Sequence, residues 1–373
     1  MFLPQLVNTF GHDLLRRYGE PVHKIAIDAG FTCPNRDGSK GAGGCTFCNN
    51  TSFSPNGRKP PSLAEQIENG RRAVFPITGA RRYIAYFQAY TNTYADVTRL
   101  AQLYDEALAE PDIVGLSVGT RPDCVSPEVL DLLAGYRERG IEVWLELGLQ
   151  SAFDKTLERV NRGHGFAEYR QALQGARARG LPVCTHLIIG LPGETRRHCL
   201  ETLDRVLELG VDGLKLHPLH VVRHTALALE WRRGQYTPLS MDQYIAIACD
   251  LIERTPAPVL FHRLTATAGS DILLAPLWCA GKWRVLNGIA AELHRRGHCQ
   301  GTYAAPATEV VIERSIIDDS RNENAQSPSD ETTNHSTRLP KDGSQVAGYP
   351  RPLPQGARVR TDLIRCHELG KYQ

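Results

Sequence analysis

Three cysteines in one glycine-rich stretch are the residues of this chain whose spacing best supports chemistry. Cys33, Cys45 and Cys48 follow a C-x11-C-x2-C pattern within AGFTCPNRDGSKGAGGCTFCNN. Thiolates bind iron or zinc, and a Cys-x2-Cys pair brings two sulfurs onto one metal centre. The intervening glycines let the backbone approach a bulky ligand and leave amide groups free to face it. The sequence therefore predicts a metal centre in this loop.

The number of cysteines in the loop favours an iron–sulfur cluster over zinc. A structural zinc site is closed by four protein ligands, whereas a cubane cluster on three cysteines leaves one iron open. The zinc interpretation stays open, because a distant residue could supply the fourth ligand; the candidates are His164, His186, His217 and Cys124. A second cluster is not expected, since no other Cys-x2-Cys pair occurs among Cys184, Cys199, Cys249, Cys279, Cys299 and Cys366.

Six short apolar segments with strand character alternate with helical patterns along the body of the chain. We expect strands at 24–28, 83–87, 113–118, 143–147, 183–189 and 213–217. Such alternation predicts a parallel sheet. Its spacing of about 30 residues fits a full or partial (β/α) barrel, with a doubly wound open sheet as the alternative. A Rossmann dinucleotide site is disfavoured, because no GxGxxG follows any of these segments.

Polar residues follow several of these strands on the side where the cysteine loop follows the first one. They include Gln88, the run Tyr90–Thr93, the run Thr120–Asp123, Glu146 with Gln150 and Ser151, His186, and Lys215 with His217. Because parallel sheets place their sites at the carboxyl ends of the strands, this convergence indicates an enzyme.

The composition sets limits on partners and on organisation. The chain has 373 residues, 23% of them charged, and a net charge of +2, which argues against a strong global field for nucleic acid or membrane. We expect a cytoplasmic protein without a membrane span or export signal. The segment 318–345 contains only Ala325 and Leu339 as apolar residues, so we expect a disordered tail over 318–373.

An ordered set of segments resembles the radical S-adenosylmethionine superfamily, and within it the bacterial YhcC family, which is related to the elongator catalytic-subunit group. Residues 20–225 carry most of the resemblance, in GFTCPNRDG, GGCTFCN, YFQAYTNTYA, GLSVGTRPDC, ELGLQS, NRGH, HLIIGLPGET and KLHPLHVV. HRLTATA and WRVLN extend it to near residue 300. It implies a partial (β/α)6 barrel as the core over 1–230, with a C-terminal helical and strand extension over 231–317 packed on the barrel.

The resemblance also implies the cofactors and the reaction. A [4Fe–4S] cluster would be held by Cys33, Cys45 and Cys48, with S-adenosylmethionine on its open iron. Reductive cleavage would give methionine and a 5′-deoxyadenosyl radical that abstracts hydrogen from an unknown substrate, a small molecule or RNA. An electron donor such as flavodoxin or ferredoxin would be a partner. The alternative is a zinc-stabilised binding module without radical chemistry.

The same resemblance implies which residues contact S-adenosylmethionine. Phe47 and Ile189 would pack against the adenine, and Tyr90 and Thr91 take the place of the turn that holds the methionine amino group. Polar contacts to the ribose and carboxylate would come from Gln150 and Arg162, with Ser151 beside them. Two residues depart from the pattern of related enzymes, since Gly119 and His186 stand where some of those enzymes have acids.

Overall fold

The computed structural model describes residues 3–49 and 60–304. The tail expected over 318–373, and the end of the expected extension, lie outside the described residues. Seven strands form one parallel sheet in the order β1-β2-β3-β4-β5-β6-β8. They are β1 (Val22–Ile27), β2 (Arg82–Phe87), β3 (Ile113–Thr120), β4 (Glu142–Gln150), β5 (Val183–Ile189), β6 (Gly213–Pro218) and β8 (Leu260–Arg263).

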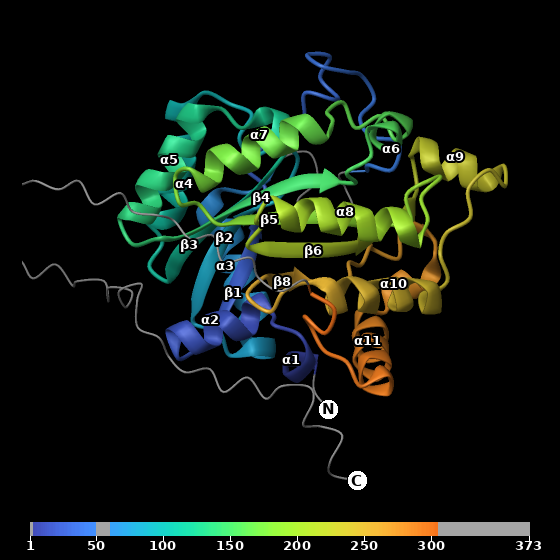
Figure 1. The fold of residues 1–373 in the computed structure, drawn as a ribbon. Coiled ribbons are helices and arrows are strands. Elements are labelled where there is room, and N and C mark those ends of the chain that lie inside the picture. Colours follow the sequence, from blue (N-terminus) through green and yellow to red (C-terminus); the bar gives the residue numbers. More distant parts are fainter. Residues whose placement is uncertain (1–2, 50–59, 305–373) are drawn as a thin grey trace, which may run out of the picture. The chain divides into compact units, whose positions relative to one another are not determined.

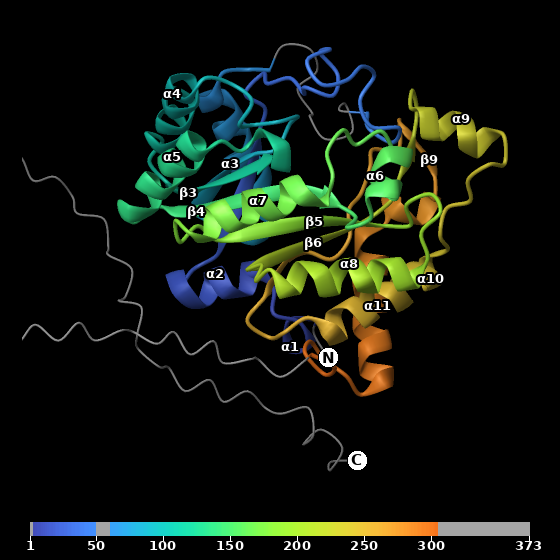
Figure 2. The same ribbon diagram turned by 45° about the horizontal axis from the view of Figure 1, so that its top comes forward.

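The sheet is curled into a half-barrel, with its helices on the outer face (Figures 1 and 2). The expected partial barrel is confirmed, and the doubly wound alternative is wrong, because strand order follows chain order without reversal. The segment near residue 260 does more than cover the barrel, since β8 pairs in parallel with β6 as the seventh strand. Strands lie in the sheet in the order of the sequence when each β–α–β connection has the same right-handed sense and adds the next strand at the same edge.

The helices of the described chain fall between and after the strands. They are α1 (Leu3–Leu6), α2 (Phe10–Tyr18), α3 (Leu63–Thr78), α4 (Val97–Leu108), α5 (Pro127–Glu138), α6 (Asp154–Arg159), α7 (Phe166–Arg177), α8 (Arg196–Glu208), α9 (Ala226–Arg232), α10 (Met241–Arg254) and α11 (Lys282–Arg296). Two short 3-10 turns cover Pro122–Cys124 and Leu277–Ala280, and a small antiparallel pair joins β7 (Val221–Val222) to β9 (Leu273–Ala275).

Local sequence signals explain several helix boundaries. Ser126 caps α5 by accepting a hydrogen bond from Val129 N, and Pro127 occupies the first helical position, where its missing N–H is no loss. Ser240 forms a capping box with Gln243 at the start of α10. These caps fix where each helix begins and therefore where the preceding loop ends at the rim of the sheet.

The core lies between the outer face of the sheet and the helices that cover it. It contains buried side chains of every strand of the parallel sheet, and Tyr104, Tyr169 and Tyr244 are among the largest fully buried side chains. In residues 3–49 and 60–304, no helix combines the length and apolar character needed to cross a membrane. The inner face carries an apolar cluster that includes Ile84 and Trp144, and toward the carboxyl ends of the strands it carries polar and charged side chains, where the site described next lies.

Candidate active site

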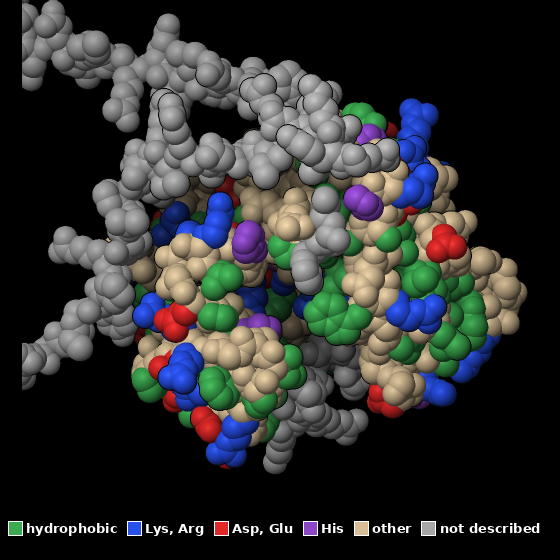
Figure 3. Space-filling model, turned by 90° about the horizontal axis from the view of Figure 1, so that it is seen from below, with side chains coloured by type: hydrophobic (Ala, Val, Ile, Leu, Met, Phe, Trp, Pro, Cys, Tyr) green, Lys and Arg blue, Asp and Glu red, His purple; other side chains and the backbone are tan. Residues whose placement is uncertain are grey.

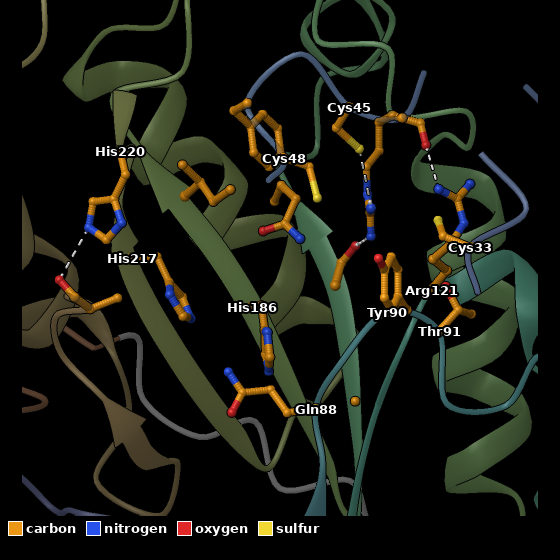
Figure 4. A pocket seen from close by; sticks show the side chains of 18 of the residues that line it. Cys33, Cys45, Cys48, Gln88, Tyr90, Thr91, Arg121, His186, His217 and His220 are labelled. Carbon is orange, nitrogen blue, oxygen red and sulfur yellow. Dashed lines mark hydrogen bonds between the residues drawn. The ribbon is translucent and has the colours of Figure 1, made fainter. Parts of the chain in front are cut away.

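A cavity opens at the carboxyl ends of the strands, where the cysteine loop follows β1 (Figure 4). The residues that line it come from the loop and from every strand end of the sheet. They are Cys33, Arg36, Gly44, Cys45, Phe47, Cys48, Tyr86, Gln88, Tyr90, Thr91, Gly119, Thr120, Arg121, Gly148, Gln150, Arg162, His186, Ile188, His217, Pro218, Leu219, His220, Val222, Arg263 and Ala266. Of the polar residues expected to converge, each of the ends of β2 to β6 contributes at least one to this lining, whereas Asn92, Thr93, Asp123, Glu146, Ser151 and Lys215 are not part of it.

The three loop cysteines all face this cavity, and all three are free thiols. Cys48 N donates to Cys45 O at 3.0 Å, which closes the tight turn between them. Gly43 and Gly44 have φ angles of 81° and 78°, a region that favours glycine. A Cβ on Gly44 would lie 2.6 Å from Arg36 Nε, so the loop also needs glycine there for space.

The cysteine loop is fastened to the segment that follows α6. Asn161 Nδ2 donates to Gly44 O at 2.8 Å, and Asn35 Nδ2 donates to Asn161 O at 2.6 Å. Thr46 N donates to Val160 O at 2.9 Å. These bonds fix the position of the cysteine loop relative to Arg162, because Arg162 directly follows Asn161 in the segment that the loop contacts.

The spacing of the sulfurs bears on the kind of metal they can hold. In the described chain, one group of three or more potential ligand atoms lies within 4.8 Å, and it is Glu146, Cys184 and His186, not the three loop cysteines. A single tetrahedral zinc, at about 2.3 Å from each sulfur, would bring the sulfurs to about 3.8 Å from one another. The three sulfurs, as the structure places them, are therefore not gathered around a single tetrahedral site.

No distant candidate for a fourth zinc ligand forms, with the loop thiols, a described group whose ligand atoms all lie within 4.8 Å of one another. Cys124 and His164 are absent from the cavity lining. His186 and His217 do line it, but Figure 4 shows them across the cavity from the cysteines. His186 Nε2 is also engaged, at 2.7 Å from Glu146 Oε2. The donor set of the loop thus remains three thiols, which fits a cluster with one open iron.

Most residues expected to contact S-adenosylmethionine line the cavity, and two do not. Phe47, Tyr90, Thr91, Gln150 and Arg162 are part of the lining. The two outside it are Ser151, whose Oγ lies 2.5 Å from Glu194 Oε1, and Ile189, a residue of the core. Strand alternation explains the second case, because Ile188 faces the cavity and its neighbour must then face the helices.

Two of these lining residues hold unusual backbone conformations. Tyr90 and Gln150 have φ angles of 62° and 81°, which non-glycine residues seldom adopt. At Gln150 the register between β4 and β5 also shifts, so that β4 contains one extra residue. Such strain concentrates where a structure directs side chains toward a ligand. Both residues line the cavity.

Arg162 connects the thiol loop with β4. Its Nη1 lies 3.6 Å from Cys45 Sγ, and its Nη2 donates to Gly148 O at 2.6 Å. A Cβ on Gly148 would lie 2.8 Å from Arg162 Nη2, so only glycine leaves room for this contact. Buried polar atoms without a hydrogen-bond partner among the described residues include Arg162 Nε and Thr91 Oγ1. Both atoms are donors available to a cofactor in the cavity.

A buried ion-pair network lies beneath the cavity, around Glu146 on β4. The Glu146 carboxylate is fully buried, and its Oε1 accepts from Lys24 Nζ and Ser117 Oγ, both at 2.6 Å. Its Oε2 accepts from Lys215 Nζ and lies beside His186 Nε2. Lys215 Nζ also donates to Tyr86 OH at 2.9 Å. Both carboxylate oxygens are thus satisfied by side chains, so the group with Cys184 needs no metal ion.

Burial shifts the protonation of the groups around Glu146. Burial lowers the pKa of Lys215 to about 7, although Glu146 opposes this shift. Burial and the Lys215 ammonium lower the pKa of His186 to about 4, so this imidazole is neutral at neutral pH. Burial alone would raise the pKa of Glu146, but Lys215 and Lys24 hold it well below its ordinary value. The carboxylate is therefore ionised and acts as the fixed anion of the network.

Sequence reasoning missed several residues that the structure brings to the site. Tyr86 and Arg263 line the cavity, and Lys24 and His262 join the network around Glu146. Inward-facing parity on β1 and β2 could have identified Lys24 and Tyr86. The alternation of inward- and outward-facing side chains could not have identified Arg263, because the register between β6 and β8 shifts by one residue just before it.

Comparisons with known proteins agree with this arrangement. Residues 33–206 match the family model described as the Radical SAM superfamily, and residues 211–295 match the model of the Radical_SAM C-terminal domain. The chain is 52% identical over 297 residues to Protein YhcC of Escherichia coli (strain K12), covering 80% of this chain and 95% of that protein. It is 32% identical over 160 residues to a tRNA uridine(34) acetyltransferase of Dehalococcoides mccartyi, covering 42% and 34%.

A solved structure supports the fold independently. The archaeal Methanocaldococcus infernus Elp3 with an N-terminal deletion superposes with a TM-score of 0.53 at 19% identity, covering 74% of this chain and 64% of that chain. At this identity the likeness concerns the fold alone. The family model covers the cysteine loop and the strands that form the cavity, and the identity to YhcC extends over most of both chains. This chain belongs to the radical SAM superfamily.

Proposed function

We propose that this protein is a radical S-adenosylmethionine enzyme whose [4Fe–4S] cluster is held by Cys33, Cys45 and Cys48. The observation that carries the proposal is that three free thiols, not all within 4.8 Å of one another, face a cavity whose described lining contains no fourth cysteine. When bound, the cluster and S-adenosylmethionine supply a 5′-deoxyadenosyl radical that abstracts hydrogen from the substrate.

The chain's own residues bind and orient the cofactor in this proposal. Arg162 is fixed by Gly148 O and has one N–H left over, which suits a carboxylate in the cavity. Thr91 Oγ1 is a second buried donor without a partner in the described structure. Phe47 and Ile188 offer apolar surface to the adenine, with Ile188 in the place first expected for Ile189. Gln150 faces the ribose from the strained end of β4.

Anaerobic reconstitution with iron and sulfide tests the proposal. Wild type should take up iron and sulfide, acquire visible thiolate-to-iron absorbance, and release 5′-deoxyadenosine after reduction. Cys45→Ser should lose all three properties. Cys124→Ser is the matched control, because Cys124 lies outside the cavity but was a candidate fourth zinc ligand. A colourless wild type that retains zinc and makes no 5′-deoxyadenosine would establish the zinc-stabilised binding module instead.

RNA is one candidate substrate, and a small molecule is the other. The tRNA acetyltransferase that resembles this chain matches only 42% of it, and the net charge of +2 gives RNA no general support. Binding of tRNA at increasing salt separates the two. If the substrate is RNA, affinity should fall steeply with salt as counterions are released from phosphates. Reduction requires a low-potential donor, for which flavodoxin and ferredoxin are the proposed partners.

A further inference from the structure

The charges that line the cavity are all of one sign. Its described lining includes Arg36, Arg121, Arg162 and Arg263 and no Asp or Glu side chain. In Figure 3, Lys or Arg and His side chains are visible in and around a hollow in the middle of the face shown. A concave site of this composition attracts anions, because low-dielectric walls focus its field.

Three of the four arginines already have fixed partners. Arg36 Nη2 donates to Cys48 O at 2.7 Å, and Arg162 Nη2 donates to Gly148 O at 2.6 Å. Arg121 forms an ion pair with Asp123 at 2.9 Å. The guanidinium of Arg263, the fourth, forms no hydrogen bond or ion pair with residues 3–49 and 60–304, whereas its backbone pairs with Lys215. This half-buried guanidinium therefore has its hydrogen-bond donors available to an anion in the cavity.

A backbone irregularity brings Arg263 to the cavity. Leu214 pairs with Phe261 and Lys215 pairs with Arg263, so β8 has one residue more than β6 at this point. This extra residue makes a β-bulge, a feature that redirects side chains beside active sites. His262 then stacks on Phe10 at 4.0 Å between ring centroids, while the next side chain, Arg263, lines the cavity. The carboxylate of Glu146 below does not compensate Arg263, because Lys24 and Lys215 already pair with it.

A second donor without a partner lies near Arg263. Among the described residues His217 Nε2 is buried and has no hydrogen-bond partner, and His217 lines the cavity from β6. Burial and the Arg263 charge lower the pKa of His217 well below its ordinary value. The ring is thus neutral, and one of its nitrogens carries a hydrogen to donate. His220, from the same segment, is oriented by its contact with Ala266 O at 3.2 Å.

We propose that Arg263 and His217 form a subsite for an anionic group of the substrate, a carboxylate or a phosphate, across the cavity from the cysteines. A planar guanidinium forms two parallel hydrogen bonds with either group, and the imidazole adds a third donor. The inference rests on the proposed function, because it assigns Arg162 to the cofactor and leaves Arg263 for the substrate. The substrate is accordingly an acid, whether a metabolite or a nucleotide.

Titration of simple anions tests the subsite in protein that carries its cluster and is saturated with S-adenosylmethionine, without reductant. The probes are inorganic phosphate, followed by phosphorus-31 line broadening, and carbon-13-labelled acetate, both at constant ionic strength. The variants are Arg263→Gln and His217→Gln, with Arg99→Gln as the matched control because Arg99 is exposed on α4. Iron content and affinity for S-adenosylmethionine are measured on every preparation.

We expect wild type and Arg99→Gln to bind at least one probe equally well. Arg263→Gln should weaken that binding by about tenfold or more, and His217→Gln by a smaller factor. Binding of phosphate alone identifies a phosphate ester, and binding of acetate alone identifies a carboxylate.

Three results would overturn the subsite: no binding of either probe, equal binding by Arg263→Gln, or a tenfold loss of affinity for S-adenosylmethionine in that variant. The last result would assign Arg263 to the cofactor instead. Failure of the proposed function is separate, because it appears as wild type without iron or without cleavage of S-adenosylmethionine.

Discussion

Neutralising Glu146 should reveal how the inside of the half-barrel is stabilised. Its fully buried carboxylate accepts from Lys24 and Ser117 through one oxygen and from Lys215 and His186 through the other. In Glu146→Gln, an amide NH2 replaces one of these oxygens. The groups that donated to it then face another donor, and at least one buried ammonium loses its acceptor.

The size of the effect follows from this burial. Removing one partner of a buried ion pair destabilises a protein by about 3–5 kcal/mol, because the remaining charge stays buried without compensation. We expect the free energy of unfolding of Glu146→Gln to fall by that amount. The matched control is Glu201→Gln, because Glu201 pairs with Arg205 on α8 and the two side chains are 38% and 40% exposed. Loss of that exposed pair should cost about 0.5 kcal/mol or less.

Urea unfolding of the cluster-free protein, followed by circular dichroism, measures both variants. The double variant Glu146→Gln with Lys215→Met provides a further check, because it removes one of the ammonium groups that Glu146→Gln would leave unpaired. Its loss of stability should be smaller than the sum of the two single losses. A Glu146→Gln variant within about 1 kcal/mol of Glu201→Gln would refute the reasoning, since the network could then not be holding charges away from water.

Other predictions concern pH and the cofactor contacts. The pKa of Lys215 is lowered in the folded protein from 10.5 to about 7, so the unfolded chain binds more protons between these values. The free energy of unfolding should therefore rise with pH from about 7 to 10.5, and urea midpoints of Lys215→Met should lack this rise. Gly148→Ala places a Cβ 2.8 Å from Arg162 Nη2. It should weaken S-adenosylmethionine binding about tenfold at unchanged iron content. Gly135→Ala is the control, because nothing lies within 4 Å of the Cβ it would add, and its S-adenosylmethionine binding should be unchanged. Arg162→Ala should retain iron and lose about 1.5–3 kcal/mol of cofactor binding by calorimetry, and unchanged affinity would exclude the proposed contact.

The sequence predicted the strands well because their signals are local. Each expected strand lies within a few residues of an observed one, since apolar runs ended by glycine, proline or a helix cap define their limits. The cysteine loop was equally accessible, because its spacing is short and its glycines are needed for backbone geometry. The family resemblance then supplied the fold, which the parallel order of seven strands confirms.

Features that depend on pairing between strands could not be predicted in this way. Ile189 was expected at the adenine from its position in a motif, and the structure places it in the core while Ile188 lines the cavity. Arg263 was not expected at the site, because the bulge that exposes it exists only when β8 pairs with β6. The partners of Glu146 come from β1, β3, β5 and β6, which converge only after the sheet has curled.

The inner face of the half-barrel has two levels that differ in how fully their charged groups are paired. At the lower level, both oxygens of Glu146 and the ammonium groups of Lys24 and Lys215 have partners within the protein, although His262 Nε2 beside them has none among the described residues. At the upper level, Arg162 Nε and His217 Nε2 are buried without partners among the described residues. Buried donors left unpaired destabilise a fold, so they persist where a ligand completes them. This contrast assigns the lower level to structural support and the upper level, on two sides of one cavity, to cofactor and substrate.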